Sequence, residues 1–336
     1  MTRRELLRLG LAALSAPLFG PLFKSWAQAQ AQAQARYPER PIRLIIPFPP
    51  GGVNDAVGRP WADKMKGLLG TVVVENMGGA GGAVGALAAA RAQPDGYTLL
   101  LGSGGTQVII PIASSQPQYD PVKAFEPISL LGITAICIAV HPSLPVQTLA
   151  ELIAYAKANP GKLSYGSAGS GTMTHLTGEL FKVLAGTPGI VHIPYRGAGP
   201  ALTDAISGHI PMITPNVTGQ VIELNKTGKL RILAVTTPTR VAAAPEIPTA
   251  IEAGLPNMIA QNFVALLAPA ATPKSIVEQV AQATRAGLSD PELQQLFHLA
   301  AFEPRPDSGP AHARHFLEEE VARWSPIIKA INLKLD

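Results

Sequence analysis

The 336-residue chain contains a single cysteine, Cys137, and few aromatic residues, which make up 5% of the sequence. One cysteine cannot form an internal disulfide, so the fold must rely on its hydrophobic core. Because Cys137 lies in the apolar run 133–140, we expect a buried, inert thiol and not a nucleophile. Glycine and proline, at 32 residues each, are abundant, so loops and turns must carry much of the architecture.

The chain also lacks a strong excess of charge of one sign. Its formal net charge is +4, but residues 1–27 contain four basic residues and only one acidic residue. The remainder holds 23 basic and 22 acidic residues, which is a net charge of +1. We therefore expect no nucleic acid or other polyanion as a partner.

Residues 1–27 have the order of a secretory signal: a basic start, an apolar segment over 9–23, and then small residues. The apolar segment is too short to span a membrane and is broken by Pro17, Gly20 and Pro21. Arg3 and Arg4 are typical of twin-arginine export. We expect residues 1–35 to be a signal peptide and a Gln/Ala linker, cleaved near 27–35, and the rest to be exported to the periplasm. No cysteine lies near the cleavage region, which argues against a lipid anchor.

The segment 42–55 organises the first half of the chain. An apolar, β-branched run over 42–48 predicts a buried strand, which leads into two prolines and two glycines. Asn54 or Asp55 is placed to cap the helix that we expect over about 55–69, although Pro60 should bend this helix or delay its start. Free N–H groups at the positive end of a helix dipole suit a carboxylate or phosphate. The candidate ligand-binding residues here are Pro50, Gly51, Gly52, Asn54 and Asp55. A loop that merely connects strand and helix is the alternative.

The same pattern returns twice within about seventy residues. Strands are expected at 72–76 and 97–101, each followed by a glycine-rich turn and a helix. This rhythm predicts a mostly parallel α/β sheet, in which ligands lie at the carboxyl ends of the strands, so Ser103 and Thr106 are candidates too. The second turn has Val84 where a dinucleotide fingerprint needs its third glycine, so we expect another close-approach turn and not an NAD site. We expect no cofactor.

A second group of elements begins after residue 141. A helix is expected over 148–158 and a strand over 163–165, followed by the rich turn 166–175. Thr172 stands where a Walker A loop needs lysine, and no serine has the G-x-S-x-G spacing of a nucleophile elbow. We therefore expect a hydroxyl- and amide-lined anion site, with Ser167, Gly169, Ser170, Gly171 and Thr172 as candidates. Simple helix capping by Ser170 and Thr172 is the alternative.

The strand expected over 190–195 ends at another glycine-containing turn, 196–200. Arg196 could pair bidentately with a carboxylate or could equally be a surface arginine. We include Tyr195, Arg196 and Gly197 among the candidate site residues.

Two apolar segments, 136–140 and 263–269, each precede a helix and suggest two crossings between two lobes. We expect lobe 1 to comprise residues 36–138 and 262–336, and lobe 2 residues 139–261. Further strands are expected at 209–214 and 230–236, and the final helices at 274–288, 291–301 and 311–331. His312 and His315 on the last helix are spaced for a metal, but no other ligand cluster accompanies them, so we expect a salt-bridged helix face and no metal.

The ordered set of motifs closely resembles the Bug receptor family, the extracytoplasmic solute receptors of tripartite tricarboxylate transporters. The matching elements include Pro49–Gly52 with Asp55, Val74–Asn76 with Gly79–Gly82, Gly102-Ser103 with Thr106, Tyr165–Gly171 with His175-Leu176, Pro194-Tyr195 with Gly197 and Gly199-Pro200, and Leu233–Val235 with Arg240, Pro248-Thr249 and Glu252–Gly254.

This resemblance implies a two-lobed periplasmic binding protein fold, type II-like, with two Rossmann-like domains and a ligand cleft between them. It implies a monomeric receptor without enzymatic activity that captures a mono-, di- or tricarboxylate and passes it to membrane permease subunits. Relatives grip one carboxylate with the first turn of each lobe, which here means 50–52 with Asp55, and 167–172 with His175 ordering that turn. Asp55 is an awkward neighbour for an anion, so we expect it to cap the helix, hold a water, or meet a hydroxyl or positive group of the ligand.

The chain departs from the family pattern at several positions. Met77-Gly78-Gly79 replaces the usual Pro-Gly, Arg196 replaces a lysine, and Pro211 stands at an acidic position. Pro60 stands where relatives have a good helix former. These departures leave the identity of the ligand open.

Two other functions compete with the receptor. One is an exported, hydrolase-like enzyme acting on a small acid or ester, with Ser103 or Ser170 as nucleophile and His175 as base. Neither serine lies in a recognised nucleophile motif, and no third group is evident to orient the histidine. The other is a ligand sensor that signals to a membrane kinase.

Overall fold

A computed structural model describes residues 37–335 of the chain. The expected signal peptide, twin-arginine motif, cleavage site and most of the linker lie outside the described residues. All elements below belong to the compact unit that begins at Arg40. Within the described part, no helix combines the length and apolar character needed to cross a membrane.

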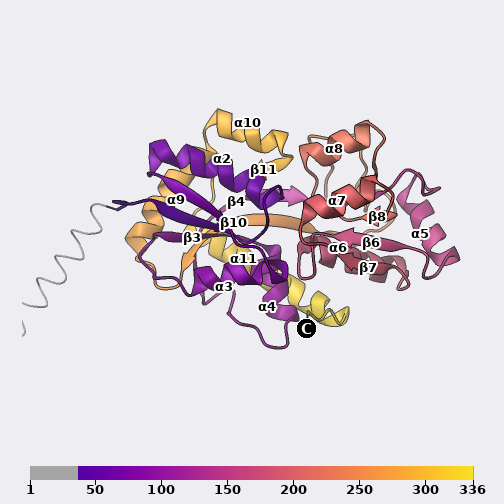
Figure 1. Cartoon of the computed structure of the whole chain (residues 1–336), viewed down its shortest axis with the longest axis horizontal. Helices are drawn as coiled ribbons and strands as arrows, with labels where there is room; N and C mark the ends of the chain where they lie inside the picture. Colours follow the sequence, from indigo (N-terminus) through magenta and orange to yellow (C-terminus); the bar gives the residue numbers. More distant parts are fainter. Residues whose placement is uncertain (1–36, 336) are drawn as a thin grey trace, which may run out of the picture. The chain divides into compact units, whose positions relative to one another are not determined.

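The first lobe is built on a sheet of six strands in the order β11-β4-β10-β3-β1-β2 (Figure 1). Its strands are β1 (Ile42–Ile46), β2 (Val72–Asn76), β3 (Thr98–Ser103), β4 (Phe125–Ala135), β10 (Gln261–Pro269) and β11 (Phe302–Pro304). β1 pairs in parallel with β2 and β3, whereas β10 runs antiparallel to β3 and β4. β1, β3 and β10 are buried along nearly their whole length, which is typical of strands covered on both faces.

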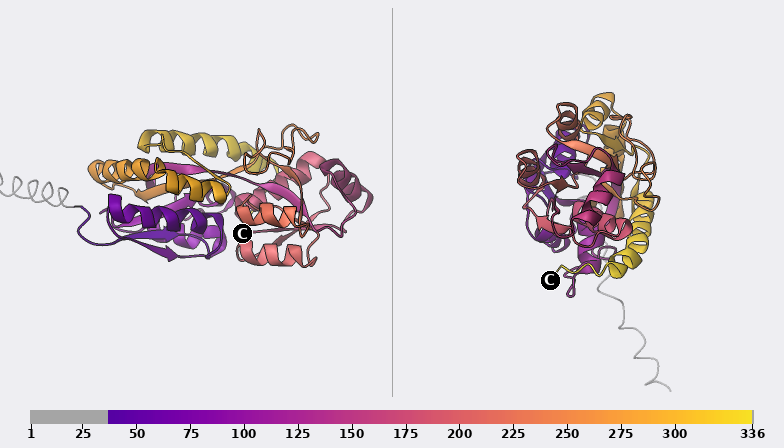
Figure 2. Two further views of the ribbon diagram at one scale, coloured as in Figure 1. Left: turned by 90° about the horizontal axis from the view of Figure 1, so that it is seen from above. Right: turned by 90° about the vertical axis from the view of Figure 1, so that its right-hand side faces the viewer.

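The helices of the first lobe are α2 (Val53–Leu68), α3 (Ala83–Ala90), α4 (Ile110–Ala113), α9 (Lys274–Leu288), α10 (Pro291–Leu299) and α11 (Pro310–Ala330). A 3-10 turn, Ala80–Gly82, precedes α3, and a π-helical turn, Gly105–Ile109, precedes α4. The long helices α9 and α11 lie side by side (Figure 2). Pro60 neither delays nor ends α2, which begins two residues before the expected start.

The second lobe is built on a sheet of five strands in the order β7-β6-β8-β5-β9. They are β5 (Cys137–Val140), β6 (Ser164–Ser167), β7 (Val191–Pro194), β8 (Met212–Ile213) and β9 (Arg231–Val235). Its helices are α5 (Leu149–Ala158), α6 (Met173–Ala185), α7 (Ala198–Ile206) and α8 (Gly219–Lys226). The two sheets with their helices confirm the mixed α/β class.

The chain changes sheet twice. Only Ile136 separates β4 from β5, and these two strands belong to different sheets. The return occurs between β9 and β10. The lobe boundaries expected after residues 138 and 261 stay a prediction.

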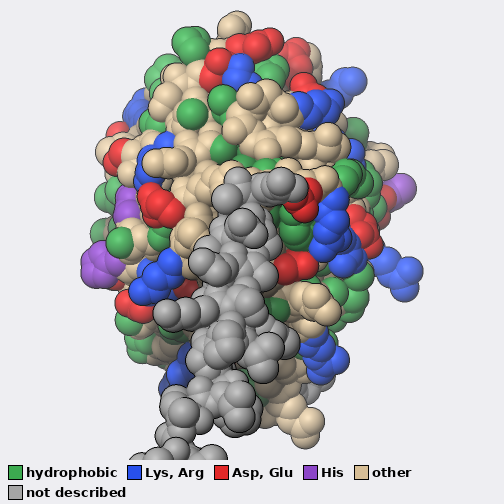
Figure 3. Space-filling model, turned by 90° about the vertical axis from the view of Figure 1, so that its left-hand side faces the viewer, with side chains coloured by type: hydrophobic (Ala, Val, Ile, Leu, Met, Phe, Trp, Pro, Cys, Tyr) green, Lys and Arg blue, Asp and Glu red, His purple; other side chains and the backbone are tan. Residues whose placement is uncertain are grey.

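The cysteine and the histidine-bearing last helix can also be compared with the expectations from the sequence. Cys137 is fully buried, and its burial raises the pKa of its thiol. The exposed His315 lies 3.1 Å from Glu319 on α11, and the described residues contain no group of three potential metal ligands. Basic and acidic side chains are interspersed on the part of the face that Figure 3 shows in colour.

Candidate functional site

The turn after β1 presents the first free donors. Gly51 has a φ of +90°, which favours glycine, and Gly52 is the N-cap of α2. The first intrahelical hydrogen bond runs from Asp55 N to Gly52 O at 3.1 Å. The N–H groups of Gly52, Val53 and Asn54 therefore have no acceptor within the helix. The expectation that Asn54 or Asp55 caps α2 is wrong, because both lie inside its first turn.

The carboxylate of Asp55 is held by neighbours of its own lobe. It accepts hydrogen bonds from Arg59 at 3.0 Å, from Asn76 at 3.1 Å and from the N–H of Gly51 at 3.2 Å. Burial alone would raise the pKa of Asp55, but these hydrogen bonds outweigh it and the pKa is lowered. The negative charge is compensated locally, which explains how an acid can stand beside an anion site.

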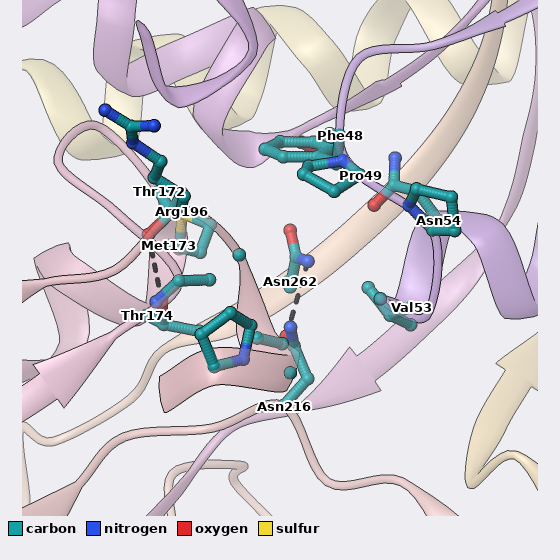
Figure 4. A pocket seen from close by; sticks show the side chains of 18 residues that line it. Phe48, Pro49, Val53, Asn54, Thr172, Met173, Thr174, Arg196, Asn216 and Asn262 are labelled. Atoms are coloured by element: carbon teal, nitrogen blue, oxygen red, sulfur yellow. Dashed lines mark hydrogen bonds between the residues drawn. The ribbon is translucent and has the colours of Figure 1, made fainter. Parts of the chain in front are cut away.

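The side chain of Asn54 lies between the first turn of α2 and the cavity described below. Its Nδ2 donates to the carbonyl of Leu101 on β3 at 3.0 Å, and the residue is only 3% exposed. This bond leaves the amide oxygen on the opposite side, and Figure 4 shows that oxygen facing the cavity. Among the described residues, none donates a hydrogen bond to it.

Ser103 and Thr106 lie at the carboxyl end of β3. The Ser103 N–H donates to the Thr106 hydroxyl at 3.0 Å, and that hydroxyl donates to Ser103 O at 3.2 Å. Thr106 thus closes the turn, whereas the Ser103 hydroxyl lines the cavity and has no partner among residues 37–335.

The turn after β6 uses most of its donors internally. The N–H groups of Ala168, Gly169 and Gly171 donate to Thr174 Oγ1, Ser167 Oγ and His175 Nδ1 at 3.0, 3.1 and 3.3 Å. Thr172 caps α6, because its hydroxyl accepts from His175 N at 3.3 Å and donates to Gly169 O at 2.7 Å. The capping alternative is therefore confirmed for Thr172. The donors left for a ligand are the N–H groups at the start of α6, those of Met173 and Thr174.

Two stacked histidines support this turn from behind. The rings of His175 and His192 lie 3.9 Å apart at 13°. Burial, with the charge of Lys182, lowers the pKa of His175 to about 4. Burial, with the neighbouring His175, lowers the pKa of His192 to about 3. Both imidazoles are neutral at pH 7, as the role of His175 Nδ1 as an acceptor requires.

The serine–histidine pairs of the enzyme hypothesis are not formed within the described residues. His175 Nδ1 is occupied by the N–H of Gly171, and neither Ser103 nor Ser170 bonds to it. The serine–histidine contact that does exist joins Ser167 Oγ to His192 Nε2 at 2.7 Å. Ser167 is 1% exposed and also accepts from Gly169, so this pair supports the turn.

A third helix begins at the same place, and the sequence reading missed it. The segment 196–200, read as a turn, contains the N-cap Gly197, with φ +122°, and the first residues of α7. Ala198 and Gly199 supply two more free N–H groups, while Pro200 lacks one. A proline just inside a helix start after a glycine could have signalled this helix.

These elements surround a small cavity of about 60 Å³, the inner chamber (Figure 4). Its polar lining comes from Gly52, Val53, Asn54, Ser103, Thr172, Met173, Thr174, Gly197, Ala198, Gly199, Asn216 and Asn262. The positive ends of α2, from the first lobe, and of α6 and α7, from the second, meet at this chamber. Among the described residues that line it, Arg196 is the one with a charged side chain. The arrangement suits an anion.

Asn216 and Asn262 were not expected in the site. Asn262 Nδ2 donates to Asn216 Oδ1 at 3.3 Å. Asn262 belongs to β10, the strand that returns to the first sheet, and Asn216 forms a bridge with Ile136, the residue between β4 and β5. Asn262 directly precedes the crossing strand expected from residue 263. In the sequence, a polar residue directly before an apolar strand was the only indication that Asn262 belongs to the site.

A wider groove of about 1000 Å³, the outer groove, adjoins the chamber. The two share Phe48, Pro49, Pro50, Ala168, Arg196 and Gly197. Figure 4 shows the guanidinium of Arg196 directed away from Asn216 and Asn262, so its charge faces the groove and not the chamber. Tyr195 also lines the groove, and its hydroxyl donates to Asp204 at 2.7 Å.

The candidate residues divide into three sets. The inner chamber is lined by Pro50, Gly52, Asn54, Ser103, Thr172, Arg196 and Gly197. The outer groove is lined by Gly169, Ser170 and Tyr195 together with Pro50, Arg196 and Gly197. Neither cavity is lined by Gly51, Asp55, Thr106, Ser167, Gly171 or His175. The last set shapes the turns without reaching the cavities.

Comparison with known proteins fits this geometry. Residues 57–333 match the model of the tripartite tricarboxylate transporter family receptor. The chain is 34% identical to protein BugT of Bordetella pertussis over 302 residues, which cover 89% of this chain and 91% of BugT.

Solved structures are similar over nearly the same span. The periplasmic binding protein BugD has a TM-score of 0.83 at 33% identity, covering 89% of this chain and 99% of BugD. MatC from Rhodopseudomonas palustris, with bound malate, has a TM-score of 0.82 at 28% identity and covers 87% of this chain and 100% of MatC. An R. palustris protein with adipate has a TM-score of 0.83 at 30% identity, and the match covers 89% of this chain and 99% of that protein. These similarities confirm the two-lobed periplasmic binding protein fold.

Proposed function

Because the chain belongs to the tripartite tricarboxylate transporter receptor family, we propose that it is a periplasmic receptor for a small organic acid. In this role it captures the acid between its lobes and delivers it to the membrane permease subunits of a transporter of that type. It acts as a monomer and needs no cofactor. The family is one of solute-binding receptors, which fits a protein without catalysis.

One observation carries this proposal: helix N-termini from both lobes meet at the inner chamber. α2 contributes the N–H groups of 52–54 from the first lobe, and α6 and α7 contribute those of 173–174 and 198–199 from the second. A carboxylate bound there contacts both lobes at once, so binding favours the arrangement in which the lobes are together. No carboxylate side chain lines the described chamber to compete with it.

The two cavities suggest how the rest of the ligand lies. The chamber, at about 60 Å³, holds the carboxylate end, and the body of the acid extends into the adjoining groove of about 1000 Å³. Arg196 stands where the two meet and can pair with a second carboxylate. The similar structures with malate and adipate both hold dicarboxylates, of different length, which supports this class of ligand.

The test is calorimetric titration of the protein lacking residues 1–35, unfolded and refolded once to remove any bound ligand. The panel contains mono-, di- and tricarboxylates and aromatic acids, and each acid is recovered and identified after titration. We expect one-to-one binding with micromolar affinity or tighter, and unchanged acid. Turnover of any acid would refute the receptor role, and silence across the whole panel would refute acid binding.

A further inference from the structure

The inner chamber offers an acceptor next to its donors. The seven backbone N–H groups around it can only donate, and so suit carboxylate oxygens, whereas the Oδ1 of Asn54 can only accept. Its amide orientation is fixed, because turning the amide over would place Oδ1 against the carbonyl oxygen of Leu101, which now accepts from Nδ2 at 3.0 Å. A carboxylate alone therefore leaves this acceptor without a donor.

The burial of Asn54 makes this acceptor significant. The residue is 3% exposed, and Figure 4 shows its oxygen facing Asn262 across the chamber. Ser103, 2% exposed, also lines this chamber, and its hydroxyl, which has no partner within residues 37–335, can accept or donate. A buried acceptor that lacks a donor weakens a complex, so a ligand that supplies one is favoured.

We propose that the ligand is a 2-hydroxy acid, whose carboxylate lies at the helix N-termini and whose hydroxyl donates to Asn54 Oδ1. The inference rests on the proposed function, and it specifies which group the ligand carries on the carbon next to its carboxylate. The carboxylate and the hydroxyl lie on adjacent carbons of such an acid. Asn54 offers both matching groups, because its N–H is free in the first turn of α2 and Figure 4 shows its Oδ1 facing the chamber.

A 2-amino acid would also carry a donor at that position, but its charge is wrong for the chamber. The positive ends of three helices surround the chamber, and an ammonium group there would lie against them. The nearest carboxylate of the first turn, Asp55, does not line the chamber and is paired with Arg59 at 3.0 Å. A neutral hydroxyl is the donor that fits.

Matched pairs of acids test this proposal without any substitution. The refolded protein is titrated with lactate and propionate, malate and succinate, and 2-hydroxyglutarate and glutarate, and with aspartate and glutamate as the 2-amino partners. In each pair that binds, we expect the 2-hydroxy acid to bind at least tenfold more tightly than the acid without the hydroxyl and than the 2-amino acid. Equal affinity within the pairs, or tighter binding of the 2-amino acids, overturns the proposal while the acid receptor stands. Absence of binding by any acid overturns the proposed function as well.

The variant Asn54→Ala then assigns the preference to one atom. It should reduce the affinity for the 2-hydroxy acid at least tenfold while changing that for its partner less than threefold. Asn159→Ala is the matched control, because Asn159 also donates its amide to a backbone carbonyl, that of Tyr155 on α5 at 3.0 Å, but lines neither the chamber nor the groove. A refolded Asn54→Ala protein with the preference intact contradicts the assignment.

Discussion

The imidazole of His175 stacks on that of His192 with ring centroids 3.9 Å apart, directly behind the turn that begins α6. Through this pair the turn is tied to β7, because His175 Nδ1 accepts from Gly171 N and His192 Nε2 contacts Ser167 Oγ at 2.7 Å. Two neutral rings can stack in this way, whereas two imidazolium ions would repel each other. The turn therefore depends on both rings staying neutral.

Acid should destabilise the protein through this pair. The folded-state pKa values, about 4 for His175 and about 3 for His192, lie below the ordinary value of 6.5. The unfolded chain therefore takes up protons first, so this contribution to stability is complete above pH 6.5 and is lost as the pH falls towards 4. For His175 it is on the order of 3 kcal/mol. Denaturant unfolding between pH 7.5 and 4.5 measures it.

The variant His192→Phe keeps a flat ring but removes one of the two basic groups. Its free energy of unfolding should fall less steeply between pH 6.5 and 4.5 than that of the wild type. The variant His298→Gln, at an exposed position on α10, is the control and should follow the wild-type curve. Identical slopes for wild type and His192→Phe would show that the pair does not govern the acid response.

The N-cap of α6 is a separate source of stability. The hydroxyl of Thr172 accepts from His175 N at 3.3 Å and bonds to Gly169 O at 2.7 Å, and the residue is 5% exposed. Thr172→Ala should lower the free energy of unfolding by about 1–2 kcal/mol, and Thr172→Ser by much less, since serine keeps the cap. Urea unfolding at pH 7.5 compares the three proteins. Equal losses for alanine and serine would mean that the methyl group, and not the hydroxyl, matters.

The sequence revealed the elements better than the site. The strand 72–76 and the helix 274–288 were predicted with the bounds that the structure has, because each carries a clear apolar period between breaking residues. The strand, glycine turn and helix around residue 50 were likewise evident. α7 was missed because its first residues, Gly197 to Pro200, have the composition of a loop.

The use of each hydrogen-bond donor could not be read from the sequence. The glycine-rich turn 166–172 was expected to grip a ligand with its backbone, but Thr174, Ser167 and His175 occupy three of its N–H groups. Asn216 and Asn262 reach the chamber only because two crossings of the chain bring them together. Which N–H groups are already occupied, and which side chains meet at the chamber, depends on three-dimensional contacts that the order of residues does not reveal.

Arg196 should distinguish diacids from monoacids. Its guanidinium faces the outer groove at the point where that groove meets the inner chamber. Arg196→Ala should weaken the binding of dicarboxylates at least tenfold and that of monocarboxylates less than threefold, because only a diacid has a second carboxylate to pair with it. Arg196→Lys should lie between, since it keeps the charge but not the bidentate geometry. Calorimetry with each class gives the ratios, and an equal loss for both classes would exclude this pairing.

Close contact between glycines of the two lobes should be needed for tight binding. Gly105 lies at the start of the π-helical turn of the first lobe, and a Cβ there would come within 2.9 Å of Gly171 O in the second lobe. Gly105 has no positive φ, so alanine fits its backbone, and the substitution acts through this contact. Gly105→Ala should therefore force the second turn away and lower ligand affinity at least tenfold.

Replacing glycine by alanine also lowers the conformational entropy of the unfolded chain. The control must therefore be a glycine-to-alanine substitution at another position. Gly67 lies within α2, and a Cβ there meets nothing within 4 Å. Gly67→Ala should leave affinity unchanged and raise stability by about 0.5–1 kcal/mol, because alanine favours the helix. Calorimetry and thermal unfolding of both variants separate the effects. Wild-type affinity in Gly105→Ala would mean that the ligand does not require the two turns to meet as they do here.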